Sequence, residues 1–171
     1  MADQPHIVII GNGAAGNRAA DILRERDRDC RISIVSAGAL LFYNRYELPD
    51  VFRGRQDWRD YLQHPPEYYR DNDISLWRKS IVADVDTAQR KLTLAHREEH
   101  GFDQLLVATA GAGYLPDPFQ APLPLMHCFT TFPPPSQIYT PLPTCGHAVM
   151  LIDALLVFAL SPTSTHTGYP V

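Results

Sequence analysis

Cysteine is scarce in this chain of 171 residues, and the few cysteines share no motif. Cys30, Cys128 and Cys145 are odd in number and show no Cys-x-x-Cys spacing. This pattern argues against a disulfide framework and against a paired-thiol redox or zinc motif. We therefore interpret all three as reduced thiols and expect a cytoplasmic protein.

Long apolar runs are missing as well. The longest, residues 148–160, is interrupted by Asp153 and is too short to cross a bilayer. The N-terminus lacks the basic and then apolar order of a secretory signal, because Asp3 precedes an apolar run of only four residues. We therefore expect no membrane partner.

Positive charge is absent from the last third of the chain. All 15 lysines and arginines lie before residue 98, whereas eleven of the 15 prolines follow residue 111. The net charge of −4 argues against a nucleic-acid partner. The change in composition predicts an α/β domain followed by a proline-rich C-terminal extension, since residues 133–135 are consecutive prolines that no central strand or helix interior accepts.

What the chain does contain is a glycine-rich turn directly after the apolar residues 7–10, which predict a buried strand. Gly11, Gly13 and Gly16 follow with G-x-G-x-x-G spacing. The first glycine permits the turn, the second lets a pyrophosphate approach the backbone, and the third lets the next helix pack closely. Free amides at that helix N-terminus bind phosphate. The motif favours dinucleotide binding, with a plain structural turn as the alternative.

Periodicity predicts the elements that follow the turn. We expect a helix over residues 14–27 and a strand over residues 31–35, which together complete a βαβ unit. The predicted apolar face of the helix consists of Ala15, Ala19, Ile22 and Leu23. Pro66 predicts the first turn of a short helix that ends near Asn72. Further strands are expected over residues 74–77, 80–85, 91–94 and 104–108, with the last one interpreted as buried.

The carboxylate that usually accepts hydrogen bonds from the ribose is absent. It is expected about 20 residues after the glycine motif. That place is occupied by Ser36, and Ala37, Gly38 and Ala39 follow it. A serine can still bond a ribose hydroxyl, but without charge assistance the contact should be weaker.

Four segments together resemble the N-terminal part of the FAD-dependent pyridine nucleotide oxidoreductases, within them the nitrite reductase large-subunit and rubredoxin reductase type. Residues 8–16 resemble the FAD pyrophosphate turn, and residues 42–49 an aromatic-x-Arg segment beside the flavin. Residues 82–86 are similar to the strand that meets the adenine, and residues 102–109 to the strand that returns beside the cofactor.

The resemblance implies a Rossmann-like, three-layer FAD-binding α/β domain over residues 1–118, incomplete in this chain. No residue of this chain can be named as a catalytic acid, base or nucleophile. The cofactor-binding residues that it implies are Gly11, Gly13, Ala14, Ala15 and Gly16 at the pyrophosphate, Ser36 at the ribose, Arg45 near the phosphates or flavin, Val82 at the adenine, and Ala108 and Thr109 beside the cofactor.

The sequence departs from this family at several points. Ala110 replaces a glycine, and its methyl is expected to crowd a close backbone approach. The redox cysteine of the disulfide reductases is absent from residues 41–48. Residues 119–146 are interpreted as a proline-rich connection, and residues 147–171 as a degenerate start of an NAD(P)H domain plus a tail. Residues 152–157 lack every glycine of its motif, so NAD(P)H binding by this chain is doubtful.

Two function classes stay open. The first is an FAD-binding oxidoreductase that transfers electrons from NAD(P)H to a protein or small acceptor, as the resemblance implies. The second is a non-catalytic, truncated nucleotide-binding or interaction fragment. The expected partner is a redox protein or the remainder of the enzyme.

One local pattern suggests other chemistry. Residues 96–100 fit the H-x-x-E-H zinc pattern, which requires a helix. Their position between two predicted strands favours a polar hairpin turn, so we expect no metal site. Arg45 likewise has a plain alternative as an ion-paired surface residue.

Overall fold

The computed structural model describes residues 4–47 and 57–111, so the predictions for residues 119–146 and 147–171 lie outside the described residues. The described chain falls into two units. The first contains residues 4–43 and 62–110 and holds all the named strands. The second contains the two short 3-10 helices, η1 (Arg45–Glu47) and η2 (Trp58–Tyr61), which the amide of Asn44 joins by donating to the carbonyl of Tyr61 at 2.9 Å.

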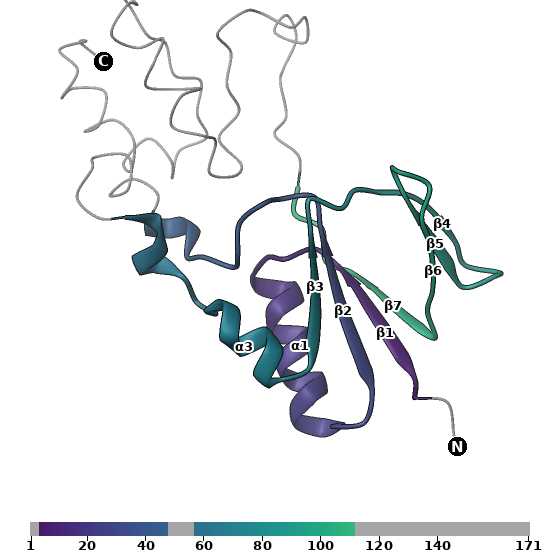
Figure 1. Cartoon of the computed structure of the whole chain (residues 1–171), viewed down its shortest axis with the longest axis horizontal. Coiled ribbons are helices and arrows are strands. Elements are labelled where there is room, and N and C mark those ends of the chain that lie inside the picture. The colour runs from purple at the N-terminus through teal and green to yellow at the C-terminus, as the bar shows by residue number, and fades with distance from the viewer. Residues whose placement is uncertain (1–3, 48–56, 112–171) are drawn as a thin grey trace, which may run out of the picture. The chain divides into compact units, whose positions relative to one another are not determined.

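A four-stranded parallel sheet organises the first unit, as Figure 1 shows. Its strands are β1 (His6–Ile10), β2 (Arg31–Ser36), β3 (Ile74–Arg78) and β7 (Gln104–Val107). Their order is β3-β2-β1-β7, and every neighbouring pair is parallel. This order and direction, with a helix between β1 and β2, confirm an α/β fold of the Rossmann-like kind.

Helix α1 (Ala14–Arg26) starts where the sequence predicts, and Ala19 and Leu23 of its predicted apolar face pack against the core. Ala15 is exposed, whereas Asn17 and Arg24 are buried together with Gly16 and Ala20. The predicted face was wrong at Ala15, and it did not include two polar side chains that find hydrogen-bond partners inside. Arg24, for example, donates to the carbonyls of residues 28, 72 and 73 at 2.8–3.0 Å.

Helix α3 (Pro66–Asp71) confirms the prediction made from Pro66 and Asn72. Proline suits the first helical turn because its missing N–H would have no partner there. Asn72 follows the last turn, and its side chain donates to the carbonyl of Tyr68 at 2.9 Å. The helix places Tyr69, which is buried, against α1 and the parallel sheet.

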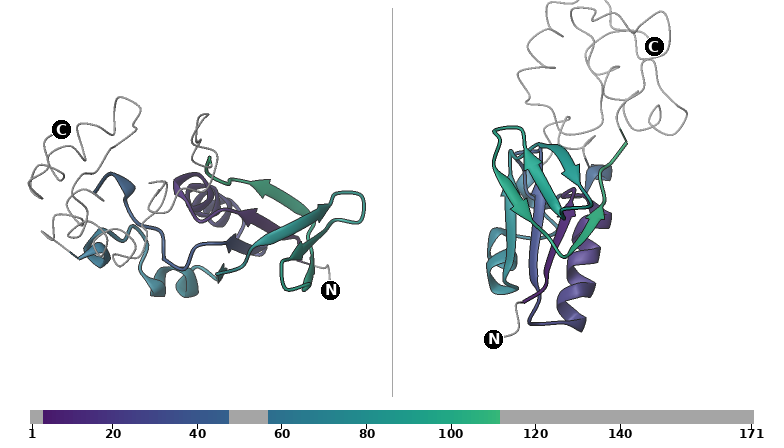
Figure 2. Two further views of the ribbon diagram at one scale, coloured as in Figure 1. Left: turned by 90° about the horizontal axis from the view of Figure 1, so that it is seen from above. Right: turned by 90° about the vertical axis from the view of Figure 1, so that its right-hand side faces the viewer.

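A second sheet contains the antiparallel strands β4 (Val82–Asp86), β5 (Lys91–Leu94) and β6 (Glu99–Gly101). Strand β6 was not expected, because its polar residues were interpreted as part of a turn. It pairs with β5, with Leu92 opposite His100. In the left view of Figure 2 this three-stranded sheet lies well away from α1.

Side chains alternate between the two faces of the parallel sheet, as strand geometry requires. Ile7 and Ile9 of β1 join the cluster that includes α1 and α3. Val8, between them, joins a second cluster with Val35 and with Leu92 of the antiparallel sheet. Helices, parallel sheet and antiparallel sheet therefore form three layers, with one apolar cluster on each side of the central one.

Strand β7 corrects a further prediction, because it is not buried. Leu106 is 39% exposed and Val107 is 64% exposed, although Leu105 packs in the second cluster. Strand β7 pairs only with β1 in the described part of the chain, so its outer edge meets no other strand there. An apolar run predicts a strand, but its burial depends on neighbours that local sequence does not specify.

His6 fastens the start of β1 to the end of the antiparallel sheet. Its Nδ1 lies 2.9 Å from the carbonyl oxygen of Gly101, and its Nε2 lies 2.8 Å from the hydroxyl of Ser33. A carbonyl only accepts, so Nδ1 carries the hydrogen and a neutral ring accepts from Ser33 at Nε2. Burial, followed by the nearby charge of Arg31, lowers the pKa of His6.

Helices in the described residues are all too short or too polar to cross a membrane.

Candidate functional site

Gly11 starts the turn after β1 in a conformation that favours glycine. Its φ is +126°, and its amide donates to the carbonyl of Val35 at 2.8 Å. A Cβ on this residue would lie 2.2 Å from the carbonyl oxygen of Ala108. The turn therefore passes directly against the segment that follows β7, and a side chain would separate them.

Gly16 lets the helix pack onto the turn. A Cβ at this position would lie 2.0 Å from the carbonyl oxygen of Gly11 and 3.3 Å from the side chain of Ile9. Because Gly16 carries no side chain, the first turn of α1 can pack against the end of β1. The third glycine of the motif thus has the packing role that its position indicates.

Gly13, in contrast, faces open space. It is the N-cap residue of α1, no side chain caps the helix there, and a Cβ would meet no atom within 4 Å. Ala14 and Ala15 follow, both exposed, and the first turn carries no acidic residue. The N-terminal end of the helix is thus accessible on the side of Gly13, where its dipole favours an anion.

Ala108 and Thr109 lie beside the turn, and their predicted place beside a cofactor stays a prediction. The amide of Ala108 donates to the carbonyl of Ile10 at 2.8 Å, which extends the β1–β7 pairing by one bond. Ala108 is half-buried and Thr109 is exposed. The structure therefore brings Gly11, Ala108 and Thr109 together at the carboxyl ends of the neighbouring strands β1 and β7.

Ser36 ends β2, and no carboxylate stands near it in the loop of residues 37–41. Its hydroxyl accepts from the amide of Gly38 at 3.2 Å, and its carbonyl accepts from the amide of Ser80 at 2.9 Å. The second bond brings the chain entering β4 to the end of β2. Val82, the first residue of β4, is half-buried two residues further on.

The surroundings of Ser36 are positively charged. Arg78 stands opposite Ser36 in the β2–β3 pairing and donates to the carbonyl of Ala39 at 3.0 Å. An open pocket of about 560 Å³ is lined by Ala39, Leu76, Arg78 and Lys79. This side of the site therefore presents cations where the sequence motif usually presents an acid.

Arg45 belongs to the second unit, where it begins η1. Gly11, Gly13, Gly16 and Ser36, in contrast, all belong to the first unit. Its predicted contact with phosphate or flavin stays a prediction.

Comparison with known proteins decides the family. The model of the pyridine nucleotide-disulphide oxidoreductase family matches residues 5–131, well over half of the chain. The chain belongs to this family. A nitrite reductase [NAD(P)H] of Bacillus subtilis is 31% identical over 119 residues, which are 69% of this chain and 14% of the relative. An NADH oxidase of Methanocaldococcus jannaschii is 29% identical over 115 residues, which are 64% of this chain and 26% of the relative.

A solved structure agrees on the fold. The NADH:rubredoxin oxidoreductase of Clostridium acetobutylicum superposes with a TM-score of 0.76 at 19% identity, over 98% of this chain and 43% of that one. In length, this member of the pyridine nucleotide-disulphide oxidoreductase family spans only 14% and 26% of the two curated relatives named above.

The H-x-x-E-H pattern has no metal-binding geometry in this family member. Glu98 lies between the two histidines, with its carboxylate 2.8 Å from Nε2 of His96 and 3.2 Å from Nε2 of His100. The hydrogen bond from His96 lowers the pKa of Glu98. No group of three or more potential ligands that could hold a metal occurs within residues 4–47 and 57–111. Residues 96–98 lie between β5 and β6, and residues 99 and 100 belong to β6, so the pattern is not on a helix.

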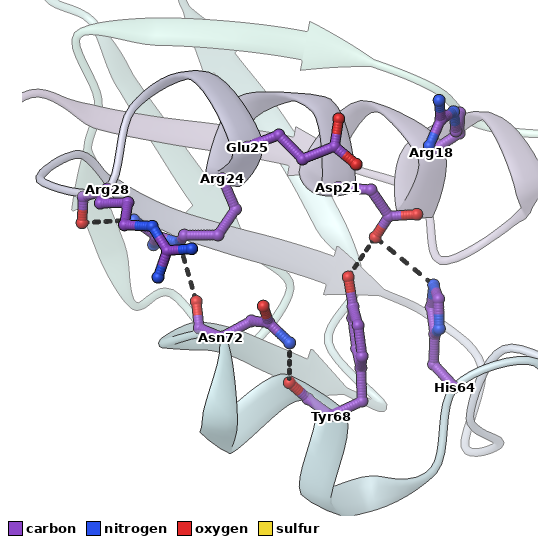
Figure 3. A pocket seen from close by; sticks show the side chains of 8 residues that line it. All are labelled: Arg18, Asp21, Arg24, Glu25, Arg28, His64, Tyr68 and Asn72. Atoms are coloured by element: carbon purple, nitrogen blue, oxygen red, sulfur yellow. Dashed lines mark hydrogen bonds and ion pairs between the residues drawn. The ribbon is translucent and has the colours of Figure 1, made fainter.

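A pocket of about 320 Å³ between α1 and α3, drawn in Figure 3, has a structural explanation. Asp21 accepts a hydrogen bond from the hydroxyl of Tyr68 and lies 3.5 Å from Nε2 of His64. The imidazole of His64 stacks on the ring of Tyr68 with centroids 3.9 Å apart. Burial and this bond raise the pKa of Tyr68. These contacts join α3 and the chain before it to α1, away from the glycine turn.

Sequence reasoning missed two residues of the site in this family member, Asn12 and Asn17. Asn17 is 1% exposed, and its amide donates to the side chain of Asn12 and to the carbonyl of Gly13. A polar residue directly after the last motif glycine is the one available signal. It does not identify a partner, because Tyr69, to which Asn17 is also bonded, lies 52 residues away.

Proposed function

We propose that this chain binds the adenosine and pyrophosphate part of FAD at the turn of residues 11–16. In this proposal it is the flavin-binding portion of a cytoplasmic oxidoreductase that passes electrons from NAD(P)H to a protein or small acceptor. The open space at Gly13 is the main support, because a pyrophosphate needs that space and a Cβ would fill it. The residues present therefore fit the group.

The chain's own residues have distinct parts in this proposal. Gly11 and Gly16 shape the turn, and the uncapped N-terminus of α1 supplies amide N–H groups for the phosphates. Ser36 accepts from or donates to the ribose, Val82 lies at the adenine, and Ala108 and Thr109 border the cofactor. Bound flavin supplies the redox chemistry itself.

A second part of the proposal concerns the NAD(P)H donor site and the electron acceptor. The B. subtilis nitrite reductase and the M. jannaschii NADH oxidase are both named for NADH-linked chemistry, but this chain spans only 14% and 26% of them. We propose that the remainder of the enzyme or a redox partner protein supplies the donor site. The alternative is a nucleotide-binding protein without turnover.

The deciding experiment is a titration of the purified full chain with FAD, followed by flavin absorbance and fluorescence. We expect saturable binding in the wild type. Gly13→Ala should weaken it by about 1–3 kcal/mol, or roughly five- to 150-fold, because the methyl occupies the pyrophosphate position. A matched control is Gly101→Ala in β6, where the nearest atom lies at 3.9 Å.

Three outcomes separate the alternatives. Absence of FAD binding by the wild type, or equal binding by Gly13→Ala and Gly101→Ala, contradicts the proposed site. Binding with no bleaching on anaerobic addition of NADH supports the site and favours the alternative without turnover. Bleaching by NADH supports electron transfer by this chain alone.

A further inference from the structure

Both polar atoms of the Asn12 side chain, between the first two motif glycines, are hydrogen-bonded. The amide nitrogen of Asn12 donates to the carbonyl of Leu40 at 3.2 Å, and its oxygen accepts from the amide of Asn17 at 2.9 Å. Leu40 lies in the loop after β2, four residues beyond Ser36. Asn12 therefore connects the glycine turn to the loop on the ribose side of the proposed site.

Both side-chain N–H groups of Asn17 and its side-chain oxygen are hydrogen-bonded to the turn and to one tyrosine. Its amide nitrogen donates to Asn12 and to the carbonyl of Gly13, both at 2.9 Å, and its oxygen accepts from the hydroxyl of Tyr69 at 2.9 Å. A buried amide costs stability unless it is bonded in this way. Fully satisfied, such a network holds one conformation of the groups that it joins.

Tyr69 links the network to a distant element. It lies on α3, is 4% exposed, and its hydroxyl also lies 3.5 Å from the oxygen of Asn12. Burial raises its pKa to about 12, so the hydroxyl stays protonated and donates at neutral pH. Its neighbour Tyr68 donates instead to Asp21, further along α1. Two adjacent tyrosines thus reach α1, and only one of them reaches the turn.

We propose that Tyr69 is a positioning residue, which acts through Asn17 and Asn12 to hold the glycine turn in the shape that receives a pyrophosphate. The identity of the ligand in this inference rests on the proposed function, whereas the effect of Tyr69 on the conformation of the turn does not. A turn fixed in advance loses less conformational freedom on binding, so a ligand binds more tightly. Without the hydroxyl, the side-chain oxygen of Asn17 loses its bond to Tyr69, and only the bonds to Asn12 and Gly13 orient the amide of Asn17.

The experiment compares Tyr69→Phe with Tyr68→Phe in the full chain, since each variant loses one hydroxyl that donates a hydrogen bond to a side chain of α1. We expect Tyr69→Phe to weaken binding of FAD and of ADP roughly two- to tenfold, the range for one hydrogen bond. ADP carries only the adenosine and pyrophosphate, so its affinity reports on the turn alone. Tyr68→Phe should leave both affinities unchanged. Thermal unfolding of each variant establishes that both remain folded.

A double-mutant cycle identifies the route from Tyr69 to the turn. Asn12→Ala should weaken ADP binding as well. Adding Tyr69→Phe to it should lower the ADP affinity less than Tyr69→Phe does in the wild type, because the connection through Asn12 is already lost. Fully additive effects overturn the proposed route.

Amide hydrogen exchange of the ligand-free protein supplies a readout that needs no ligand. Exchange over residues 11–17 should be faster in Tyr69→Phe than in the wild type and unchanged in Tyr68→Phe. Equal exchange in the two variants overturns the inference. Faster exchange in Tyr69→Phe, together with no FAD or ADP binding by the wild type, contradicts the proposed function and supports the positioning role.

Discussion

Gly16 and Gly11 are in backbone contact, since a Cβ on Gly16 would lie 2.0 Å from the carbonyl oxygen of Gly11. That atom belongs to the backbone and cannot rotate away as a flexible side chain would. We therefore expect Gly16→Ala to lower the free energy of unfolding by about 1–3 kcal/mol, because α1 must shift from β1. Urea denaturation measures this change.

Gly13→Ala is the control for that prediction. The added methyl meets no atom within 4 Å, so the expected loss is only the preference for glycine over alanine at an N-cap, about 1 kcal/mol or less. Equal destabilisation by the two substitutions contradicts the assignment of packing to Gly16 and access to Gly13.

Ser36→Asp should strengthen binding of ADP and FAD by about 1 kcal/mol. A carboxylate accepts a charge-assisted hydrogen bond from a ribose hydroxyl, which is stronger than the bond of a neutral serine. Arg78, opposite Ser36 in the sheet, lowers the cost of the new charge. Calorimetric titration of both ligands tests this expectation.

The exposed Ser75 of β3 is the matched control for Ser36→Asp, because Ser75→Asp adds the same charge elsewhere on the sheet. If Ser75→Asp changes the affinity as much as Ser36→Asp, the effect comes from net charge and Ser36 does not lie at the ribose.

His6 should make the fold sensitive to mild acid. Burial lowers its pKa below the usual 6.5, so the unfolded chain takes up a proton at a higher pH than the folded chain. The stability from the neutral ring is present above pH 6.5 and is lost as the pH falls toward the folded-state pKa. Denaturant unfolding at pH 7 and pH 5 should show a smaller decrease in His6→Gln than in the wild type.

His96, exposed in the turn before β6, provides the comparison for His6. His96→Gln should keep the wild-type decrease in stability between pH 7 and pH 5. If His6→Gln loses as much stability between pH 7 and pH 5 as the wild type does, other groups cause the acid sensitivity.

Local sequence predicted those elements of the fold whose signals lie within a few residues. Pro66 and Asn72 indicated α3, and the run of residues 7–10 indicated β1. The burial of Asn17 and Arg24 was not predictable in this way, because their partners Tyr69 and Asn72 lie about 50 residues away. The sequence shows that burying a polar side chain would be unfavourable, but only the structure shows the hydrogen-bond partners that offset this.

The candidate site follows the same division. The spacing of Gly11, Gly13 and Gly16 was sufficient to predict a turn after β1, and the structure assigns each glycine a different neighbourhood. The missing acid at Ser36 was evident from the sequence, whereas the cation of Arg78 beside it depends on the β2–β3 register. Burial of β7 was predicted wrongly, because an apolar run does not say how much of it other elements cover.

The exposed strand β7 leads to a prediction on self-association. Val107 is 64% exposed on a strand whose outer edge meets no strand in the described residues, and apolar edges promote pairing between molecules. Val107→Lys should reduce association in light scattering and change stability by no more than about 0.5 kcal/mol. Ile81→Lys, at a residue 56% exposed and outside any strand, should not reduce it.

The pairing of β1 with β7 also constrains the order of folding. Ile7 stands opposite Gln104, so the central strand of the sheet gains its second neighbour only when residues nearly a hundred positions later are available. During synthesis, β1, α1, β2 and β3 emerge first. One edge of β1 then has no strand partner until the antiparallel sheet and β7 have been synthesised. We expect the ribosome-bound chain to expose that side of β1 to chaperones until residue 107 has left the exit tunnel.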